Sequence, residues 1–234
     1  MKKLKIRFFV LLYCGVFIGA VSLCQLASSS VTVLKESEPV QNRTVIIIDA
    51  GHGGIDGGAT SCTGIPESHI NLQISLRLND LVQLLGFETK MIRKTDTSVY
   101  TEGNTIAAQK VSDLKQRVKL VNETKNAVLV SVHQNTFLDS RYSGAQVFYA
   151  NDDTSRELAK VMQADLISNL NPGSKRQCKS SDGIYLMQNI QRPGVLIECG
   201  FLSNPEEEAN LLTAEYQKQI ASVVATCISR FYSC

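Results

Sequence analysis

The chain has 234 residues, enough to build one well-filled hydrophobic core without disulfide cross-links. Its hydrophobic content of 44% and charged content of 20% are those of a globular protein and exclude a disordered or fibrous one. The formal net charge of +2 arises in the first seven residues, which carry four basic side chains; beyond them, 20 basic residues face 22 acidic ones. A near-neutral body with no tryptophan and no basic stripe argues against nucleic acid as a partner.

Residues 1–27 have the pattern of a signal peptide or membrane anchor. A basic start precedes an apolar run over 8–24 and the small residues 27–30, which a signal peptidase would accept. The run is longer than a usual signal core and shorter than the roughly 20 residues of a comfortable membrane span, so both alternatives stay open. A lipoprotein signal at Cys24 is disfavoured because the bulky Leu23 precedes it. With the basic end inside, the rest of the chain is expected outside the cytoplasmic membrane.

Residues 28–43 are polar and aperiodic, which predicts a linker, and a single domain follows over 44–232. Strands are expected at 44–49, 87–93, 128–132, 146–149, 183–187 and 195–197. Helices are expected at 66–85, 111–123, 154–170, just after Asn204-Pro205, and at 216–231. The first helix shows the pattern most clearly, with apolar residues spaced four or three apart at Ile70, Ile74, Leu78, Leu81 and Leu85.

Alternation of strands and helices predicts an α/β fold in which a twisted, mostly parallel sheet carries helices on both faces. The five cysteines beyond the leader include no Cys-x-x-Cys pair, which excludes a thiolate metal site. Cys199 and Cys227 lie in apolar stretches and are expected in the core. A bridge among Cys62, Cys178 and Cys234 is left open.

Three apolar strands lead into polar residues: His52 after the first, His133 after the third, and Glu198 after the last. The carboxyl ends of strands in an open α/β sheet line its binding crevice, so these side chains are expected to meet. Two imidazoles beside carboxylates suit a zinc ion that keeps a position open for water. A phosphate loop at 51–58 is the alternative, but it lacks the G-x-G-x-x-G spacing and no helix opens until Pro66.

The third zinc ligand is expected from the start of the first helix, where Glu67 and His69 compete. Glu67 lies three residues before Ile70 and therefore shares the buried face. His69 lies about 200° further around the helix and points away from that face. A carboxylate directed at the core needs a cation, and a metal would supply one. We therefore predict Glu67 as the ligand and His69 as a surface residue.

Glu198 has no basic neighbour in sequence, so burial is expected to raise its pKa towards neutrality. Such a carboxylate suits a general base that takes a proton from water and returns it to a leaving amine. A fourth zinc ligand, or a group that only orients a histidine, remains the alternative for Glu198.

From residue 44 to about 232 the chain resembles the zinc-dependent N-acetylmuramoyl-L-alanine amidases of the amidase-3 group. The resemblance rests on D-x-G-H-G-G at 49–54 followed by Glu67, on S-V-H-x-N at 131–135, and on the stretch 195–207. It implies that His52, Glu67 and His133 bind zinc and that Glu198 is catalytic. The implied reaction is hydrolysis of the amide between N-acetylmuramic acid and the L-Ala of the peptidoglycan stem peptide.

Within that family, the segments 113–120, 143–146 and 183–189 are similar to the germination-specific amidases of the spore cortex. The resemblance implies a role in cortex maturation, in which peptide removal prepares muramic acid for lactam formation, and a location between the membranes of the forming spore. His69 departs from the usual Asp, and Gln134 from a frequent Ala. The loop 136–143 is too short for the inhibitory helix of some relatives, so an open site under the control of an accessory protein is expected.

A non-catalytic peptidoglycan-binding or scaffold protein on the same fold is the competing hypothesis. Such a protein would be expected to have lost one of the four site residues, and the sequence retains His52, Glu67, His133 and Glu198.

Overall fold

The computed structural model describes residues 43–233. The expected signal peptide or anchor over 1–27, and all but the last residue of the expected linker over 28–43, lie outside the described residues. Within 43–233, no helix combines the length and apolar character needed to cross a membrane.

Six strands form one sheet in the order β2-β1-β3-β6-β4-β5. Neighbouring strands are parallel except for β4, which runs antiparallel to β6. The mostly parallel sheet expected from the sequence is therefore confirmed. The strands are β1 (Val45–Ala50), β2 (Glu88–Met91), β3 (Ala127–Asn135), β4 (Gln146–Tyr149), β5 (Lys179–Ser180) and β6 (Gly194–Phe201).

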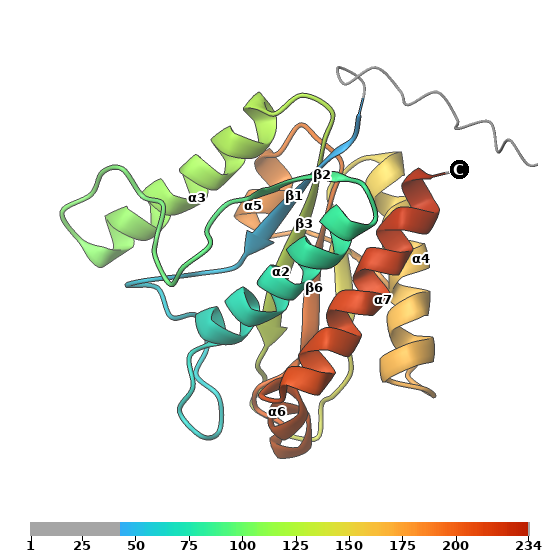
Figure 1. Cartoon of the computed structure of the whole chain (residues 1–234). Coiled ribbons are helices and arrows are strands. Elements are labelled where there is room, and N and C mark those ends of the chain that lie inside the picture. Colours follow the sequence, from blue (N-terminus) through green and yellow to red (C-terminus); the bar gives the residue numbers. More distant parts are fainter. Residues whose placement is uncertain (1–42, 234) are drawn as a thin grey trace, which may run out of the picture. The chain divides into compact units, whose positions relative to one another are not determined.

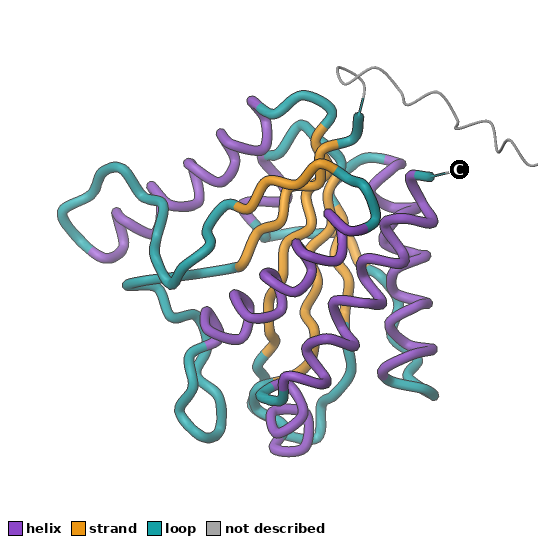
Figure 2. Tube along the Cα trace, viewed as in Figure 1, coloured by secondary structure: helices purple, strands orange, loops and turns teal. Residues whose placement is uncertain are grey.

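Helices cover both faces of this sheet, as Figures 1 and 2 show. Three long helices pack together on one face: α2 (Glu67–Leu84), α4 (Asp153–Leu170) and α7 (Ala214–Tyr232). The opposite face carries α3 (Ile106–Glu123) and the short α5 (Tyr185–Asn189). The short helix α6 (Pro205–Leu211) joins β6 to α7.

Side-chain alternation along β3 shows how the strands serve the two faces. Val128, Val130 and Val132 belong to the larger core beneath α2, α4 and α7. Leu129 belongs to the smaller core beneath α3 and α5. Because successive side chains of a strand point to opposite faces, His133 lies on the α3 side of the sheet.

The expected strand over 183–187 is wrong. Gly183 adopts a left-handed turn with φ 86°, and the chain then enters helix α5, which buries Leu186 and Met187 against the smaller core. A short apolar run fits a buried strand and a buried helical turn equally well, so the periodicity of the sequence could not distinguish the two. The sheet instead ends at the two-residue strand β5, which lacks any apolar signature.

Three other elements extend well beyond their expected bounds. Strands β3 and β6 continue past the apolar runs because His133 and Glu198 still pair across them, up to a bulge. Helix α3 begins at Ile106, five residues before the expected start, because the Thr105 side chain accepts a hydrogen bond from the backbone of Ala108 and caps it. The expected core cysteines, Cys199 and Cys227, are buried, and Cys62 and Cys178 are free thiols.

Candidate metal centre and active site

His52 lies in a sharply turned loop that follows β1. Its backbone adopts φ 60°, a left-handed conformation that few residues other than glycine adopt. Two buried arginines hold this loop by its carbonyl oxygens. Arg93 donates to Ala50 and Gly51 at 2.8 and 3.0 Å, and Arg117 donates to Ala50 and His52 at 3.1 and 2.8 Å. The backbone that carries His52 is thus held by side chains from outside its own segment.

Arg117 is itself fixed by acidic partners. Its guanidinium pairs with the buried Asp49 at the end of β1 and donates to Asp113 on the same helix at 2.5 Å. Ser131 of β3 donates to the other Asp49 oxygen at 2.7 Å. Burial alone would raise the pKa of Asp49, but the Arg117 charge outweighs it and holds the pKa below its usual value. This network ties α3, β1 and β3 together directly beneath the His52 loop.

Glu67 is the first residue of α2 and is 3% exposed. Its Oε2 accepts from the backbone of Ala59 at 2.9 Å, and its Oε1 accepts from the backbone of Gln134 at 3.0 Å and from Asn71 at 3.1 Å. A buried carboxylate with this many donors is held in one orientation. Its Oε2 faces the imidazole of His52, and its Oε1 faces that of His133.

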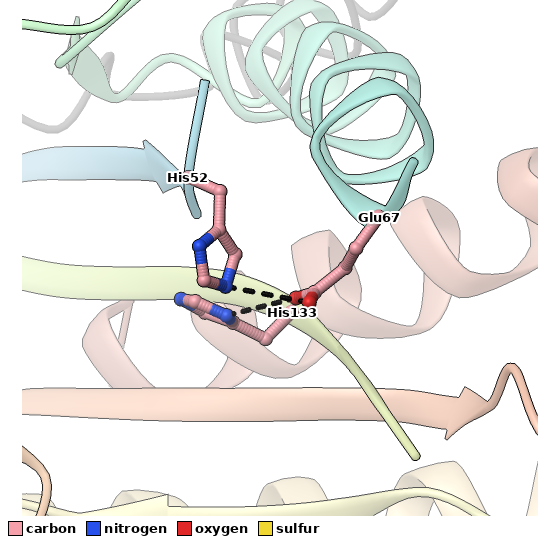
Figure 3. A group of neighbouring side chains, drawn as sticks. All are labelled: His52, Glu67 and His133. Carbon is pink, nitrogen blue, oxygen red and sulfur yellow. Dashed lines mark hydrogen bonds and ion pairs between the residues drawn. The ribbon is translucent and has the colours of Figure 1, made fainter. Parts of the chain in front are cut away.

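His52, Glu67 and His133 form one cluster, drawn in Figure 3. The Nε2 of His52 lies 3.3 Å from Glu67 Oε2, and the Nδ1 of His133 lies 3.0 Å from Glu67 Oε1. One ligand atom from each residue lies within 4.8 Å of the others. Two imidazole nitrogens and a carboxylate oxygen are a donor set that zinc enzymes use, so the residues present fit a zinc ion.

Glycine lines this cluster where any side chain would collide with it. A Cβ at Gly51 would lie 2.2 Å from His133 Nε2, and a Cβ at Gly58 would lie 2.5 Å from Glu67 Oε2. The loop between β1 and α2 therefore approaches the ligand atoms by its backbone. Beside the cluster, a cavity of about 330 Å³ extends beneath α3 and α5, with Leu114 and Tyr185 among its lining residues.

Glu67 and His52 shift each other's pKa values. Burial alone would raise the pKa of Glu67, but the hydrogen bonds and charges of His133 and His52 hold it well below its usual range. Burial alone would lower the pKa of His52, but the hydrogen bonds and charges of Glu67 and Asp56 outweigh it and raise the pKa to about 9. Without metal, the cluster therefore holds a proton on His52 at neutral pH.

Glu198 lies on β6 directly opposite His133 of β3, on the α3 face of the sheet. Its Oε2 is buried, with no hydrogen-bond partner among the described residues. Burial raises the pKa of Glu198 to about 7; the charge of Glu67 adds to this rise, and the charges of His133 and His52 oppose it. A carboxylate poised near neutrality can both accept and donate a proton at physiological pH.

Some residues that orient the cluster carry no role predicted from the sequence. Asp56 accepts from His52 Nδ1 at 2.8 Å, which directs Nε2 towards Glu67. Asn71 donates to Glu67, and Gln134 in turn donates to Asn71 at 3.1 Å. Asn71 could have been found, because it lies four residues after Glu67 on the same helical face. The spacing of four between His52 and Asp56 in a loop carried no comparable signal.

His69 points away from the cluster. Its side chain is about half exposed and pairs with Asp96 at 3.0 Å. His69→Ala is therefore expected to retain both the metal and the activity of the wild-type chain, because it removes only an exposed hydrogen bond to Asp96. Metal analysis and turnover of the purified variant check this, and loss of the metal would favour a three-histidine site instead.

Comparison with known proteins identifies the family. The sequence pattern described as N-acetylmuramoyl-L-alanine amidase matches residues 46–230, which is most of the chain. The chain belongs to the N-acetylmuramoyl-L-alanine amidase family.

Individual relatives of this amidase cover nearly all of the described chain. The germination-specific N-acetylmuramoyl-L-alanine amidase of Bacillus subtilis is 39% identical over 191 residues, which cover 81% of this chain and 80% of the relative. The CwlD amidase from Clostridioides difficile, solved in complex with the GerS lipoprotein, is 38% identical, with a TM-score of 0.78 over 82% of this chain and 99% of that one. An N-acetylmuramoyl-L-alanine amidase from Clostridium difficile 630 is 30% identical, with a TM-score of 0.70 over 82% and 98%.

These matches establish the amidase as a hydrolase of the cell-wall amidase class, with the fold expected from the sequence.

Proposed function

We propose that the chain is a zinc-dependent N-acetylmuramoyl-L-alanine amidase in which His52, Glu67 and His133 hold the metal and Glu198 transfers protons. The substrate is the amide that joins N-acetylmuramic acid to the L-Ala of the peptidoglycan stem peptide. The observation that carries the proposal is the convergence of two imidazoles and one carboxylate next to a buried carboxylate with an unpartnered oxygen.

The residues of the chain have distinct roles in this reaction. A bound zinc would polarise the scissile carbonyl and make water more acidic. Glu198 removes a proton from the attacking water through its Oε2 and delivers it to the nitrogen of the leaving L-Ala. Asp56 orients the imidazole of His52, and the arginine-held loop keeps His52 in its left-handed backbone conformation.

Zinc binding is expected to release protons and to strengthen as pH rises. His52 must lose its proton to become a ligand, and its pKa in the metal-free cluster is about 9. Protons therefore compete with zinc below about pH 9, and affinity falls as pH decreases. Calorimetric titration of the chelated full-length chain in buffers of different ionisation enthalpy measures the stoichiometry and the protons released. We expect one zinc per chain; binding without proton release would contradict this assignment.

We further propose that the chain acts outside the cytoplasmic membrane, with 1–27 as signal peptide or anchor, 28–43 as linker and 44–232 as catalytic domain. The basic, apolar and small-residue segments of the first 30 residues support export. A periplasm-dependent or extracellular reporter fused after Arg43 is expected to be active only outside the membrane. Reporter activity in the cytoplasm would contradict export.

A role in spore-cortex maturation is supported by the similarity to the germination-specific amidase of Bacillus subtilis. We propose that the chain removes stem peptides from cortex muramic acid, so that these sugars can become muramic lactam. A spore-forming host that lacks the chain is expected to make cortex without the lactam, which muropeptide analysis measures. Normal lactam content would contradict this role.

An accessory protein is proposed to control the site. The loop 136–143 contains no helix that could cover the cluster, and a similar amidase has been solved with a lipoprotein partner. Turnover and zinc retention of the purified chain are expected to rise when the corresponding lipoprotein of its host is added. Unchanged turnover and zinc retention would contradict this proposal.

A further inference from the structure

Arg176, in the segment between α4 and β5, is fixed at the side of the candidate active site. Its Nε donates to the Ser143 carbonyl at 2.8 Å, and its Nη1 donates to Gln146 Oε1 at 3.3 Å. Its guanidinium carbon lies 4.8 Å from the centre of the Phe201 ring. A guanidinium held by two acceptors and an aromatic face is pre-organised, so little entropy is lost when it binds a further group.

Strand register places this guanidinium on the catalytic face. Phe201 of β6 pairs with Asn135 of β3, which lies two residues after His133. Because alternate residues of a strand share a face, Asn135 and its partner Phe201 point to the α3 side, as His133 and Glu198 do. The bulge in β6 takes up the additional residue between Glu198 and Phe201. Gln146, the acceptor for Nη1, is the register partner of Glu198 on β4. Both side chains that contact Arg176, Phe201 and Gln146, therefore belong to the face of the sheet that carries Glu198.

Among the described residues, no acidic side chain forms an ion pair with Arg176. The charge of Arg176 acts on Glu207: burial raises the pKa of Glu207 above its usual value, and its backbone hydrogen bonds and the charge of Arg176 oppose this rise. The two oxygens of Glu207 already accept hydrogen bonds from the backbones of Phe201 and Gly144, at 2.8 Å each. The remaining N–H groups of Arg176 are free to bind an anion from outside the chain.

We propose that Arg176 binds a carboxylate of the stem peptide, the acidic group of the residue that follows L-Ala. This inference rests on the proposed amidase function and assigns the peptide side of its substrate. Phe201 lies three residues beyond Glu198, roughly 7–10 Å along the strand. An extended peptide covers the same roughly 7–10 Å in two to three residues. Stem peptides carry glutamate, or its amide, directly after L-Ala, which brings that group within reach of Arg176.

Paired substrates test the proposal. N-acetylmuramoyl tripeptides whose second residue carries either a free carboxylate or the amide are offered to the full-length, zinc-loaded chain. Wild type is expected to prefer the free carboxylate, with kcat/KM higher on the order of 10- to 100-fold, the effect of one charged hydrogen-bonding pair. Arg176→Gln is expected to remove this preference by lowering kcat/KM for the acid alone. Arg176→Lys, which keeps the charge but loses the fork of donors, is expected to retain part of the preference.

Lys175→Gln provides the matched control, because it removes the same charge from the exposed neighbouring residue. It is expected to retain the full preference. If Arg176→Gln lowers kcat/KM equally for the acid and the amide tripeptide, the proposal is overturned, because such a loss reflects a general disturbance of the site. No preference in wild type would overturn it as well. Cleavage of neither tripeptide would instead contradict the amidase function, and equilibrium binding of the two uncleaved tripeptides then decides on Arg176 separately.

Discussion

Glu198→Gln is expected to bind zinc and fold as the wild-type chain does and to lose turnover by a factor on the order of 10²–10⁴. Gln retains the size of the side chain and one acceptor oxygen, but it cannot take up a proton. Because Glu198 lies outside the three-residue cluster, the ligand atoms remain in place. Single-turnover rates on purified muropeptides, together with zinc content, measure the two effects separately.

The raised pKa of Glu198 indicates that Glu198→Gln should remain folded. Burial raises that pKa to about 7, so the substitution introduces a neutral group where the wild-type chain is partly neutral already. The variant is therefore not expected to unfold. Glu206→Gln, an exposed carboxylate at the start of α6, serves as the control and should retain full turnover. If Glu198→Gln loses zinc, Glu198 is a ligand; if it keeps near-normal turnover, another group transfers the proton.

His133→Ala is expected to abolish both zinc binding and activity. The substitution removes one of three ligand atoms, so the loss of zinc affinity should exceed the roughly 10–100-fold caused by removing a residue that only hydrogen-bonds to a ligand. It also removes a hydrogen bond to the buried Glu67, which should lower the free energy of unfolding by about 1–3 kcal/mol. Zinc titration and thermal unfolding of the chelated protein measure the two losses. The same loss of zinc is expected for His52→Ala.

His69→Ala is the matched comparison for both histidine variants, because it deletes the same ring from an exposed position. If His133→Ala still binds zinc with wild-type affinity, the cluster is not the metal centre. If it loses zinc but keeps its turnover, the metal is structural and takes no part in the reaction.

The sequence predicted the fold well where periodicity and length agreed. The helix over 66–85 and the buried strands around 46 and 130 have repeats that only one element satisfies. The segment 183–187 has no such repeat, and its packing against the α3 face decided its conformation. Helix α3 began earlier than expected because a single hydrogen bond from a capping threonine determines where it starts.

For the candidate site, two sequence signals predicted the residues of the cluster. Position at the end of a strand predicted the two histidines, and position on the buried face of a helix predicted Glu67. Helical geometry separated Glu67 from His69, and the structure places the first in the cluster and the second on the surface. The groups that fix the His52 loop could not be found in the same way. Arg93 and Arg117 bind backbone carbonyls, and a carbonyl is common to every residue, so no side-chain pattern marks the contact.

Product analysis of digested peptidoglycan tests the central claim most directly. Purified full-length chain is incubated with defined muropeptides as isolated, after chelation, and after zinc is restored, and the products are identified by mass spectrometry. The amidase account predicts sugar chains freed of peptide and stem peptides with a free L-Ala amino terminus, produced only when zinc is present. Products cut at another bond, activity that survives chelation, or binding without cleavage by the zinc-loaded chain would contradict it.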